Sequence, residues 1–348
     1  MTSLATSPRV LVTDDSALMR RILSDGLLQH GLSVVGEASS GDEALGLCRD
    51  LRPDVVTLDL AMPGLDGVDV LRALRASHSP VPVVVVSSFS NSSRAVEALA
   101  EGAIELVAKP APGESLFGFL SDLAAKLRIA AGSARSIVLP RKRAERSTAG
   151  ARSVRRARPA ATNPVTLIAC STGGPKALAE IMPRLPAALG GGGLIVQHMP
   201  AGFTRSLAER LDRTSALRVA EAAGGEAIDA KTFWLAPGGC HLRVTDQGTL
   251  RLSSEPPVGG LRPRADLTIK DAAQVYGDRL VLVVLTGMGR DGLEGAQEVR
   301  RCGGRVIAES ESSCIVYGMP RAVIEDGLAD VVVPLSEISA AIVEEAGL

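Results

Sequence analysis

The feature that most constrains the fold of this chain is a regular alternation of short apolar runs with helical patterns, which occurs in two separate stretches. Strands that alternate with helices form a parallel sheet with helices on both faces, joined by right-handed crossovers. We therefore expect the first stretch to be a doubly wound α/β domain, with ligands at the carboxyl ends of its strands. The expected strands are 9–13, 32–38, 53–60, 81–88 and 103–109, and the expected helices are 16–29, 42–50, 68–76, 92–100 and about 115–128.

A second stretch of alternation begins at residue 164. The apolar runs PVTLIA and GLIVQ enclose a helical pattern at 176–184, and three further runs follow later, DRLVLVVLTG, GRVIAES and LADVVVP. Between these parts, FWLAP, HLRVT and GTLRLSS are separated by Pro-Gly-Gly and Asp-Gln-Gly turn signals, which predict a β-hairpin inserted into the layer order. We therefore expect a second doubly wound parallel sheet that carries this hairpin.

A basic segment separates the two stretches. Residues 128–158 hold ten Arg or Lys side chains and one Glu, although the whole chain has a formal net charge of -1. Ala, Ser, Gly and Arg dominate the segment and its apolar periodicity fades, which is typical of a flexible, self-repelling tether. A chain of 348 residues is long enough for two domains. The predicted parts are a first domain at 1–127, a basic flexible linker at 128–162 and a second domain at 163–348.

Composition excludes several classes of function. Aromatic residues make up 2% of the chain, which argues against an aromatic stacking surface for nucleic acid, although the basic linker leaves nucleic-acid binding open as an alternative. No apolar run approaches the roughly 18 residues of a membrane span, and the first residues lack a secretion signal. Five cysteines without a C-x-x-C pair fit neither a disulfide framework nor a zinc site. We expect a cytoplasmic protein with reduced thiols, no membrane insertion and no nucleic-acid partner.

Polar residues stand where the expected strands of the first stretch end. They are Asp14, Asp15, Asp59, Ser87 and Lys109. Carboxylates that converge on one rim repel one another and require a hard divalent cation such as Mg²⁺. Asp59 can then attack a phosphorus atom, while Mg²⁺ and Lys109 offset the charge of the phosphoryl group and Ser87 donates a hydrogen bond to it. An aspartate at a strand end often only caps a helix, but five such positions in this order favour a phosphoryl-transfer site.

The first stretch resembles a two-component receiver domain over its whole length. The matching segments are VLVTDDSALMRRIL, PDVVTLDLAMPGLDG and the Lys109-Pro110 step. The resemblance implies a flavodoxin-like fold, Asp59 as the phosphoacceptor, and a histidine kinase as a partner. The Mg²⁺ ligands that it implies are Asp14, Asp15, Asp59 and the carbonyl of Ala61. Leu106 departs from the pattern, because many receivers carry an aromatic switch residue there.

Three chemically useful residues follow apolar runs of the second stretch. Ser171 stands in ACSTGGP, His198 in IVQHMP and Asp291 in VLTGMGRDG, and their placement at strand ends lets them converge on one rim. A serine hydroxyl is a poor nucleophile unless an imidazole takes its proton, and a carboxylate on the other ring nitrogen holds that imidazole in the right tautomer. Nearby glycines let backbone N–H groups approach an oxyanion. These residues predict a serine nucleophile, its base and an orienting carboxylate.

Alternatives remain for each of these roles. The STGG turn also suits a phosphate at a helix N-terminus, and it is not a G-x-S-x-G elbow because Ala169 replaces the first glycine. The rival nucleophile, base and carboxylate are Cys170, His241 and Asp266. Cys170 is expected to point into the sheet, since neighbouring side chains at a strand end face opposite ways. His30 and His78 stand at helix ends of the first domain and are expected to be exposed.

Residues 164–346 resemble the catalytic domain of chemotaxis protein-glutamate methylesterases of the CheB type, and the order of receiver, linker and catalytic domain matches that family throughout. The matching motifs are ACSTGGP, IVQHMPAGFT, WLAPGGCHLRV, LRPRADLTI, VLTGMGRDG and SCIVYGMPRA. The resemblance implies Ser171 as nucleophile, His198 as base and Asp291 as its orienter. It also implies an oxyanion N–H from Met288, with Thr172 assisting.

The resemblance further implies a phosphorylation-regulated serine esterase. Such an enzyme hydrolyses glutamate γ-methyl esters on the cytoplasmic helices of chemoreceptors, releases methanol, deamidates receptor glutamines and needs no cofactor for the ester chemistry. One alternative is a signalling module whose serine site is silent and whose output comes through protein contacts. Another is an esterase that acts on a substrate other than a chemoreceptor.

Overall fold

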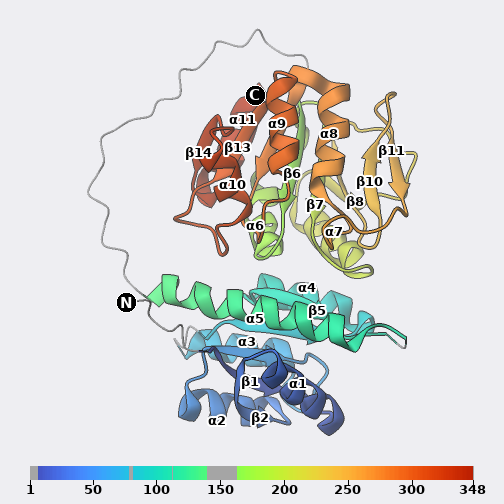
Figure 1. Cartoon of the computed structure of the whole chain (residues 1–348). Helices are drawn as coiled ribbons and strands as arrows, with labels where there is room; N and C mark the ends of the chain where they lie inside the picture. Colours follow the sequence, from blue (N-terminus) through green and yellow to red (C-terminus); the bar gives the residue numbers. More distant parts are fainter. Residues whose placement is uncertain (1–6, 78–80, 112, 139–162, 348) are drawn as a thin grey trace. The chain divides into compact units, whose positions relative to one another are not determined.

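The computed structural model of the chain describes residues 7–77, 81–111, 113–138 and 163–347. The chain divides into two compact units, Met1–Ser147 and Thr148–Leu348, which are described one after the other (Figure 1). None of the helices in these described ranges is long and apolar enough to cross a membrane.

The first unit is built on a five-stranded parallel sheet in the order β2-β1-β3-β4-β5. Its strands are β1 (Arg9–Thr13), β2 (Ser33–Ala38), β3 (Val55–Leu58), β4 (Val83–Ser87) and β5 (Glu105–Ala108). Its helices are α1 (Ala17–Gln29), α2 (Gly41–Leu51), α3 (Gly67–Ala76), α4 (Ser92–Ala100) and α5 (Leu116–Val138). The three central strands consist almost wholly of buried residues, as expected for strands covered on both faces. The predicted doubly wound sheet of the first domain is confirmed.

Helix α5 differs from the sequence-based expectation. It was expected to end near Arg128 but continues to Val138, so the predicted boundary between domain and linker falls inside the helix. The buried face continues past Arg128, since Ala130 is fully buried like Leu123 and Leu127 before it. The remainder of the predicted linker, 139–162, lies outside the described residues.

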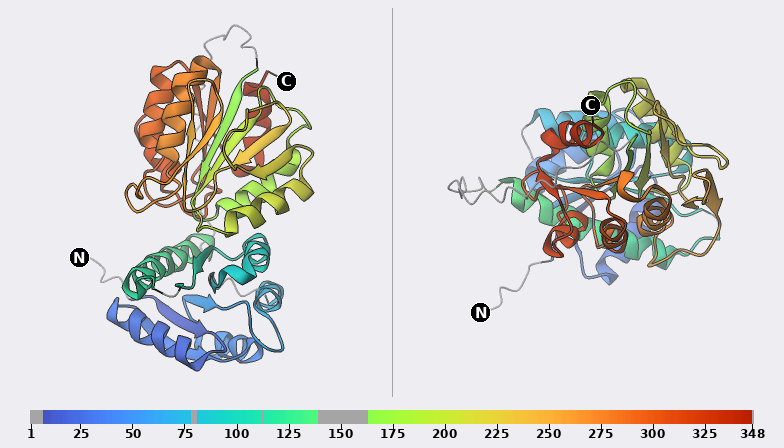
Figure 2. Two further views of the ribbon diagram at one scale, coloured as in Figure 1. Left: turned by 90° about the vertical axis from the view of Figure 1, so that its right-hand side faces the viewer. Right: turned by 90° about the horizontal axis from the view of Figure 1, so that it is seen from above.

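The second unit is built on a seven-stranded parallel sheet in the order β14-β13-β12-β6-β7-β9-β8. Figure 2 shows this unit in green to red, with helices on both sides of the sheet. Its strands are β6 (Val165–Cys170), β7 (Gly193–Gln197), β8 (Arg218–Glu221), β9 (Thr232–Leu235), β12 (Leu280–Val284), β13 (Arg305–Glu309) and β14 (Val331–Val333). Its helices are α6 (Gly174–Ile181), α7 (Phe203–Thr214), α8 (Ala265–Tyr276), α9 (Leu293–Arg301), α10 (Met319–Glu325) and α11 (Leu335–Glu345). The second doubly wound sheet is likewise confirmed.

The inserted hairpin consists of β10 (His241–Val244) and β11 (Leu250–Ser253), which pair with each other in a separate antiparallel sheet. The prediction that FWLAP belongs with this hairpin is wrong, because β9 runs parallel between β7 and β8 in the main sheet. Burial on both faces explains the difference: Phe233 is fully buried and packs over Gly193 of the neighbouring strand. Strand β8 was not predicted, since its sequence RVAE begins with an exposed arginine and carries no apolar run.

Candidate functional site

The strand order places the three predicted catalytic residues at one edge of the second sheet. Strands β12, β6 and β7 are consecutive neighbours, Ser171 follows β6, His198 follows β7, and Asp291 lies between β12 and α9. Two hydrogen bonds extend the ladder beyond the strands, from the Ser171 N–H to the Thr286 carbonyl (3.1 Å) and from the His198 N–H to the Cys170 carbonyl (3.1 Å). The carboxyl ends of adjacent parallel strands therefore bring residues far apart in sequence to one rim.

His198 and Asp291 form a buried pair. The imidazole Nε2 lies 2.7 Å from Asp291 Oδ2, and the two side chains are 7% and 1% exposed. Since an ionised carboxylate only accepts, Nε2 carries the proton of this bond and Nδ1 holds the free lone pair. Within the described residues, Nδ1 is buried and has no hydrogen-bond partner. The ring is thus held by one nitrogen, and the other is available to accept a proton.

The carboxylate of Asp291 is held at the N-terminus of α8. Its Oδ2 accepts from the Ala265 N–H (2.7 Å), and its Oδ1 accepts from the N–H groups of Asp266 and Gly292 (3.0 Å each). Burial alone would raise the pKa of Asp291, but the bonds from His198 and from the helix N-terminus outweigh it and hold that pKa well below its usual range. Asp291 is therefore a fixed anion that can stabilise a protonated imidazole.

The turn that carries Ser171 is tied to the base by Gln197. The amide Nε2 of Gln197 donates to the carbonyls of both Ser171 and His198 (3.0 Å each), and its Oε1 accepts from the Cys170 thiol (3.0 Å). Gly174 is needed beneath this amide, because a Cβ there would lie 1.9 Å from the Gln197 oxygen. Sequence reasoning missed Gln197, although a polar residue directly before His198 at the end of a buried strand was a usable signal.

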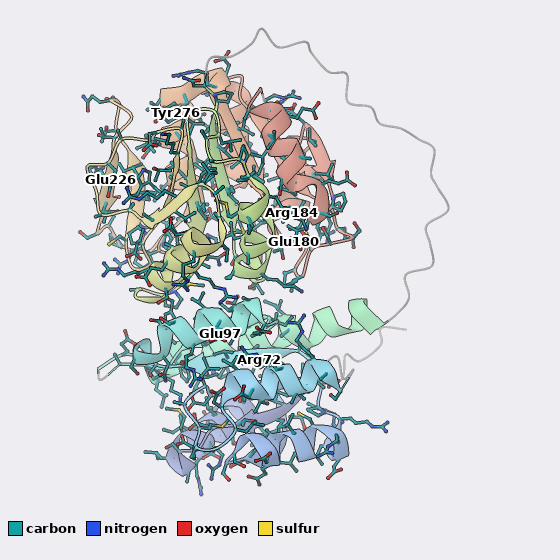
Figure 3. All side chains as sticks on the ribbon, turned by 180° about the vertical axis from the view of Figure 1, so that it is seen from behind. Arg72, Glu97, Glu180, Arg184, Glu226 and Tyr276 are labelled. Atoms are coloured by element: carbon teal, nitrogen blue, oxygen red, sulfur yellow. The ribbon has the colours of Figure 1, made fainter. Side chains whose placement is uncertain are left out.

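Thr286 and Glu309 hold the same turn from the side of β12 and β13. The Thr286 hydroxyl donates to the Thr172 carbonyl (3.0 Å), and its N–H donates to Glu309 Oε2 (2.8 Å). Glu309 is fully buried, which raises the pKa of its carboxyl. Both residues line a cavity of about 240 Å³ beside α6. Glu180 stands on its wall and pairs with Arg184 at 3.3 Å (Figure 3).

The three rival residues bond elsewhere. Cys170 is fully buried, and burial raises the pKa of its thiol, which disfavours the thiolate a nucleophile needs. Both ring nitrogens of His241 bond to backbone groups, the Arg264 N–H and the Pro256 carbonyl (3.2 Å each). Asp266 accepts from the N–H groups of Gly292 and Gly295 rather than from an imidazole.

The remaining predicted residues differ in exposure. Met288 is about half exposed at the rim, whereas Thr172 is 4% exposed. His30, expected to be exposed, is partly buried with its ring 5.6 Å from that of Phe117, because the start of α5 packs beside the end of α1. His78 lies outside the described residues.

At the strand ends of the first unit, the acidic residues converge. Carboxylate oxygens of Asp14, Asp15 and Asp59 lie within 4.8 Å of one another. Lys109 Nζ contacts Asp14 Oδ2 (2.7 Å) and Asp59 Oδ2 (2.8 Å). Burial raises the pKa of Asp14; burial also opposes the charge of Lys109, but its bonds to both aspartates raise its pKa overall. Ser87 is fully buried at the end of β4, and its carbonyl accepts from the Lys109 N–H (2.8 Å).

This donor set fits a hard divalent cation. Two of its carboxylates are buried and Asp15 is exposed, so the cluster offers oxygen ligands with an opening toward solvent. The N–H groups of Leu60 and Ala61 donate to Asp59 Oδ1 (2.7 and 3.3 Å), which fixes the orientation of that carboxylate. Leu106, at the usual position of an aromatic switch, is 1% exposed on β5.

Comparisons with known proteins agree with both halves of this description. Residues 166–342 match the family model of the CheB methylesterase, and residues 10–120 match that of the response regulator receiver domain. A protein-glutamate methylesterase/protein-glutamine glutaminase of Symbiobacterium thermophilum is 45% identical, with 97% of each chain covered. One of the same name from Pyrococcus abyssi is 41% identical, covering 96% of this chain and 92% of that one.

A solved structure agrees as well. The crystal structure of the Thermotoga maritima CheB methylesterase catalytic domain is 42% identical, with a TM-score of 0.51, and the match covers 53% of this chain and 99% of that one. In both relatives the average identity is above 40% over nearly the whole length of this chain. The chain therefore belongs to the CheB methylesterase family, in which a receiver domain precedes the methylesterase domain.

Proposed function

We propose that this protein is a phosphorylation-regulated serine esterase that hydrolyses glutamate γ-methyl esters on chemoreceptors, and that it also deamidates receptor glutamines. The observation that carries the proposal is the buried His198–Asp291 pair on the same rim as Ser171, in a chain that also holds an aspartate cluster suited to phosphorylation. The names of the relatives, protein-glutamate methylesterase/protein-glutamine glutaminase, support the choice of substrate.

Ester cleavage begins with the Ser171 hydroxyl. Its oxygen attacks the γ-carbonyl carbon of the methyl ester while its proton passes to His198 Nδ1, the nitrogen that does not face Asp291. Asp291 stabilises the resulting imidazolium. The negative charge on the former carbonyl oxygen is stabilised by the backbone N–H of Met288, with Thr172 in the supporting network.

Collapse of the tetrahedral intermediate breaks the bond to the methoxy oxygen, which takes the proton from His198 and leaves as methanol. The glutamyl group then remains as an ester on Ser171. A water molecule gives a proton to His198 and attacks that ester, which releases the glutamate carboxyl group and returns the proton to Ser171. With a glutamine substrate, the leaving group is ammonia and the remaining steps are the same.

In the receiver, Asp59 Oδ2 is the nucleophile toward phosphorus. Lys109 holds this oxygen at 2.8 Å and stays to neutralise the new phosphoryl group, while Ser87 donates a hydrogen bond to that group. Asp14, Asp15, Asp59 and the Ala61 carbonyl would hold Mg²⁺, which would supply the positive charge that lets phosphoryl oxygens approach three carboxylates. A histidine kinase of a chemotaxis-type pathway is the donor.

The partners follow from this chemistry. The ester substrates are methylated glutamates on the cytoplasmic helices of methyl-accepting chemoreceptors, so we place the protein in the cytoplasm. The proposed ester hydrolysis uses only groups of the protein and water, and needs no cofactor. We propose no role for nucleic acid.

Methanol release tests the proposal. Wild-type protein and Ser171→Ala are incubated with methylated receptor fragments, and methanol and small-ester hydrolysis are measured side by side. Methanol release by wild type but not by Ser171→Ala supports the proposal. Hydrolysis of small esters without methanol from receptors points to another substrate, and inactivity in both assays points to a silent site in a signalling module.

A further inference from the structure

Two buried carboxylates stand side by side behind the imidazole. Asp266 and Asp291 are 2% and 4% exposed, and each binds the backbone of the other's segment. Asp266 Oδ1 accepts from Gly292 (2.9 Å) and Gly295 (2.8 Å) next to Asp291, while Asp291 accepts from the Asp266 N–H (3.0 Å). This reciprocal anchoring fixes the start of α8 against the start of α9 and also forces two like charges together.

Because Asp266 and Asp291 are buried next to each other, ionising both carboxyl groups is more costly than ionising one. Burial raises the pKa of Asp266, and the neighbouring Asp291 carboxylate raises it further. The pair shares protons as one unit unless a cation offsets its charge. If the shared proton resided on Asp291, His198 would lose the negative charge that stabilises its protonated form.

Arg264 places a guanidinium between the two carboxylates. Its Nη2 lies 2.7 Å from Asp266 Oδ2, and its Nε lies 3.3 Å from Asp291 Oδ1. Among the described residues, Arg264 is the one Lys or Arg side chain that forms an ion pair with Asp266 or Asp291. Its planar fork suits this bridge, which a lysine ammonium cannot reproduce at both ends.

The position of Arg264 is itself fixed. Its backbone N–H donates to Nδ1 of His241 (3.2 Å), its Nη1 donates to the Val258 carbonyl (3.4 Å), and its side chain is 18% exposed. Glu294 of α9 also faces Arg264, and its carboxylate is paired with Lys270 of α8. That pair is close to neutral as a unit, so Arg264 supplies the net positive charge.

Resting on the proposed function, we infer that Arg264 is a positioning residue of the esterase: it keeps Asp266 and Asp291 ionised together and holds Asp291 with Oδ2 toward His198 Nε2. It touches neither the substrate nor the reacting atoms. Its effect reaches the reaction through Asp291 and His198.

The test compares Arg264→Gln and Arg264→Lys with wild type in the full-length protein. Arg262→Gln is the matched control, because Arg262 stands two residues away and donates to the carbonyls of Ser254 and Glu255 instead. For each protein, kcat and KM for methylated receptor fragments are measured across pH, together with the thermal midpoint. The imidazole resonances of His198 are followed by NMR in the same samples.

Arg264→Gln is expected to lower kcat by about 10- to 150-fold, the effect of losing one hydrogen bond to a charged group, with little change in KM. The acidic limb of the rate profile and the His198 titration should both move to lower pH, because a carboxylate pair that has taken up a proton stabilises the protonated imidazole less. Arg264→Lys should recover part of the rate and most of the shift. Arg262→Gln should resemble wild type.

Unchanged kcat in Arg264→Gln would overturn the inference. So would a lower kcat with an unmoved acidic limb and no recovery in Arg264→Lys, since that pattern is a packing defect. If Arg264→Gln does not fold, Arg264→Lys alone decides, by the presence or absence of a partial kcat loss. If wild type releases no methanol, the proposed function fails, whereas the His198 titration still tests the role of Arg264.

Discussion

The side-chain amide of Gln197 donates a hydrogen bond to the carbonyl of Ser171 at 3.0 Å, so the residue before the proposed base holds the proposed nucleophile. A second bond from the same nitrogen reaches the carbonyl of His198. The turn after β6 and the turn after β7 are thereby joined by one buried side chain. Their spacing depends on the interior of the sheet rather than on solvent-facing loops.

Gln197→Leu should therefore lower both stability and turnover. The Ser171 carbonyl keeps its bond from the Gly174 N–H (2.7 Å) but loses the one from Gln197. The His198 carbonyl loses the donor that Gln197 supplies, at a cost of about 1–3 kcal/mol for a buried group left unpaired. Denaturant unfolding and methanol release measure the two effects. Cys170→Ala is the control, because it removes the donor to the amide oxygen and leaves both carbonyl bonds in place. Equal losses in the two variants would contradict this account.

Ser171→Ala should abolish turnover, whereas Cys170→Ala should retain most of it. The buried thiol of Cys170 is held protonated and bonded to Gln197, so it has no route to the ester carbon. Phosphorylation of Asp59 by a small-molecule phosphodonor should be normal in both variants, which verifies that the receiver is intact. More than trace methanol from Ser171→Ala would remove this serine from the nucleophile's role.

The two buried histidines should respond differently to the same substitution. His198→Gln should lose most activity, because it removes the ring nitrogen that accepts the proton. His241→Gln should chiefly affect stability or KM, since both ring nitrogens of His241 form hydrogen bonds with backbone groups. Steady-state kinetics and thermal unfolding of the pair separate the roles, and reversed phenotypes would reassign the base.

Glu309 should make stability depend on pH in a predictable direction. Burial raises the pKa of this carboxyl above its ordinary value of 4.5, so the folded state favours the protonated form. Its contribution to the free energy of unfolding is then greatest below pH 4.5 and is lost as pH rises through the raised folded-state pKa. Urea unfolding from about pH 4.5 to 8 should show wild type losing stability relative to Glu309→Gln.

Glu180→Gln is the matched control for that series, because it removes a partly exposed carboxylate from the wall of the same cavity. The difference in unfolding free energy between wild type and Glu180→Gln should show no comparable dependence on pH. A difference between wild type and Glu309→Gln that stays constant across the range would mean that Glu309 does not titrate there.

Regulation should appear as restraint by the unphosphorylated receiver. A fragment that starts near Pro159 should be more active than the unphosphorylated whole chain, by about 5- to 150-fold for a typical coupling free energy. Initial rates on one receptor substrate are compared with and without phosphodonor and Mg²⁺. Equal rates for the fragment and the unstimulated whole chain would exclude inhibition. Stimulation of the whole chain without a faster fragment would instead indicate a positive contact.

The succession of most strands and helices along the chain, and the residues at the strand ends, could be predicted because both depend on local sequence. Alternating patterns gave the two parallel sheets, and parallel strands bring Ser171, His198 and the loop of Asp291 to one edge. Strand β9 was misassigned because a short buried run reads alike in a hairpin and in a parallel sheet. Its location depends on Phe233 packing against Gly193, which is a contact between segments distant in sequence.

The supporting residues could not be predicted for a related reason. Arg264 and Asp266 were visible in RPRAD, but only the packing of α8 against α9 decides which carboxylate meets the imidazole and which meets the guanidinium. Likewise, which histidine nitrogen faces Asp291 depends on the path of the loop after β12, and no spacing in the sequence encodes it.

That nitrogen assignment has a mechanical consequence. Nδ1 is bonded directly to the ring carbon that joins Cβ, whereas Nε2 is at the far end of the imidazole. Rotation about the Cα–Cβ bond moves Nε2 through a wider arc than Nδ1, and in this protein Nε2 is the nitrogen bonded to Asp291. The imidazole is therefore anchored at the nitrogen that a rotation about Cα–Cβ would move farthest, and the proposed proton acceptor, Nδ1, lies nearer to the rotation axis. Small rotations about the Cα–Cβ bond of His198 should therefore displace Nδ1 less than they would displace a proton acceptor at Nε2.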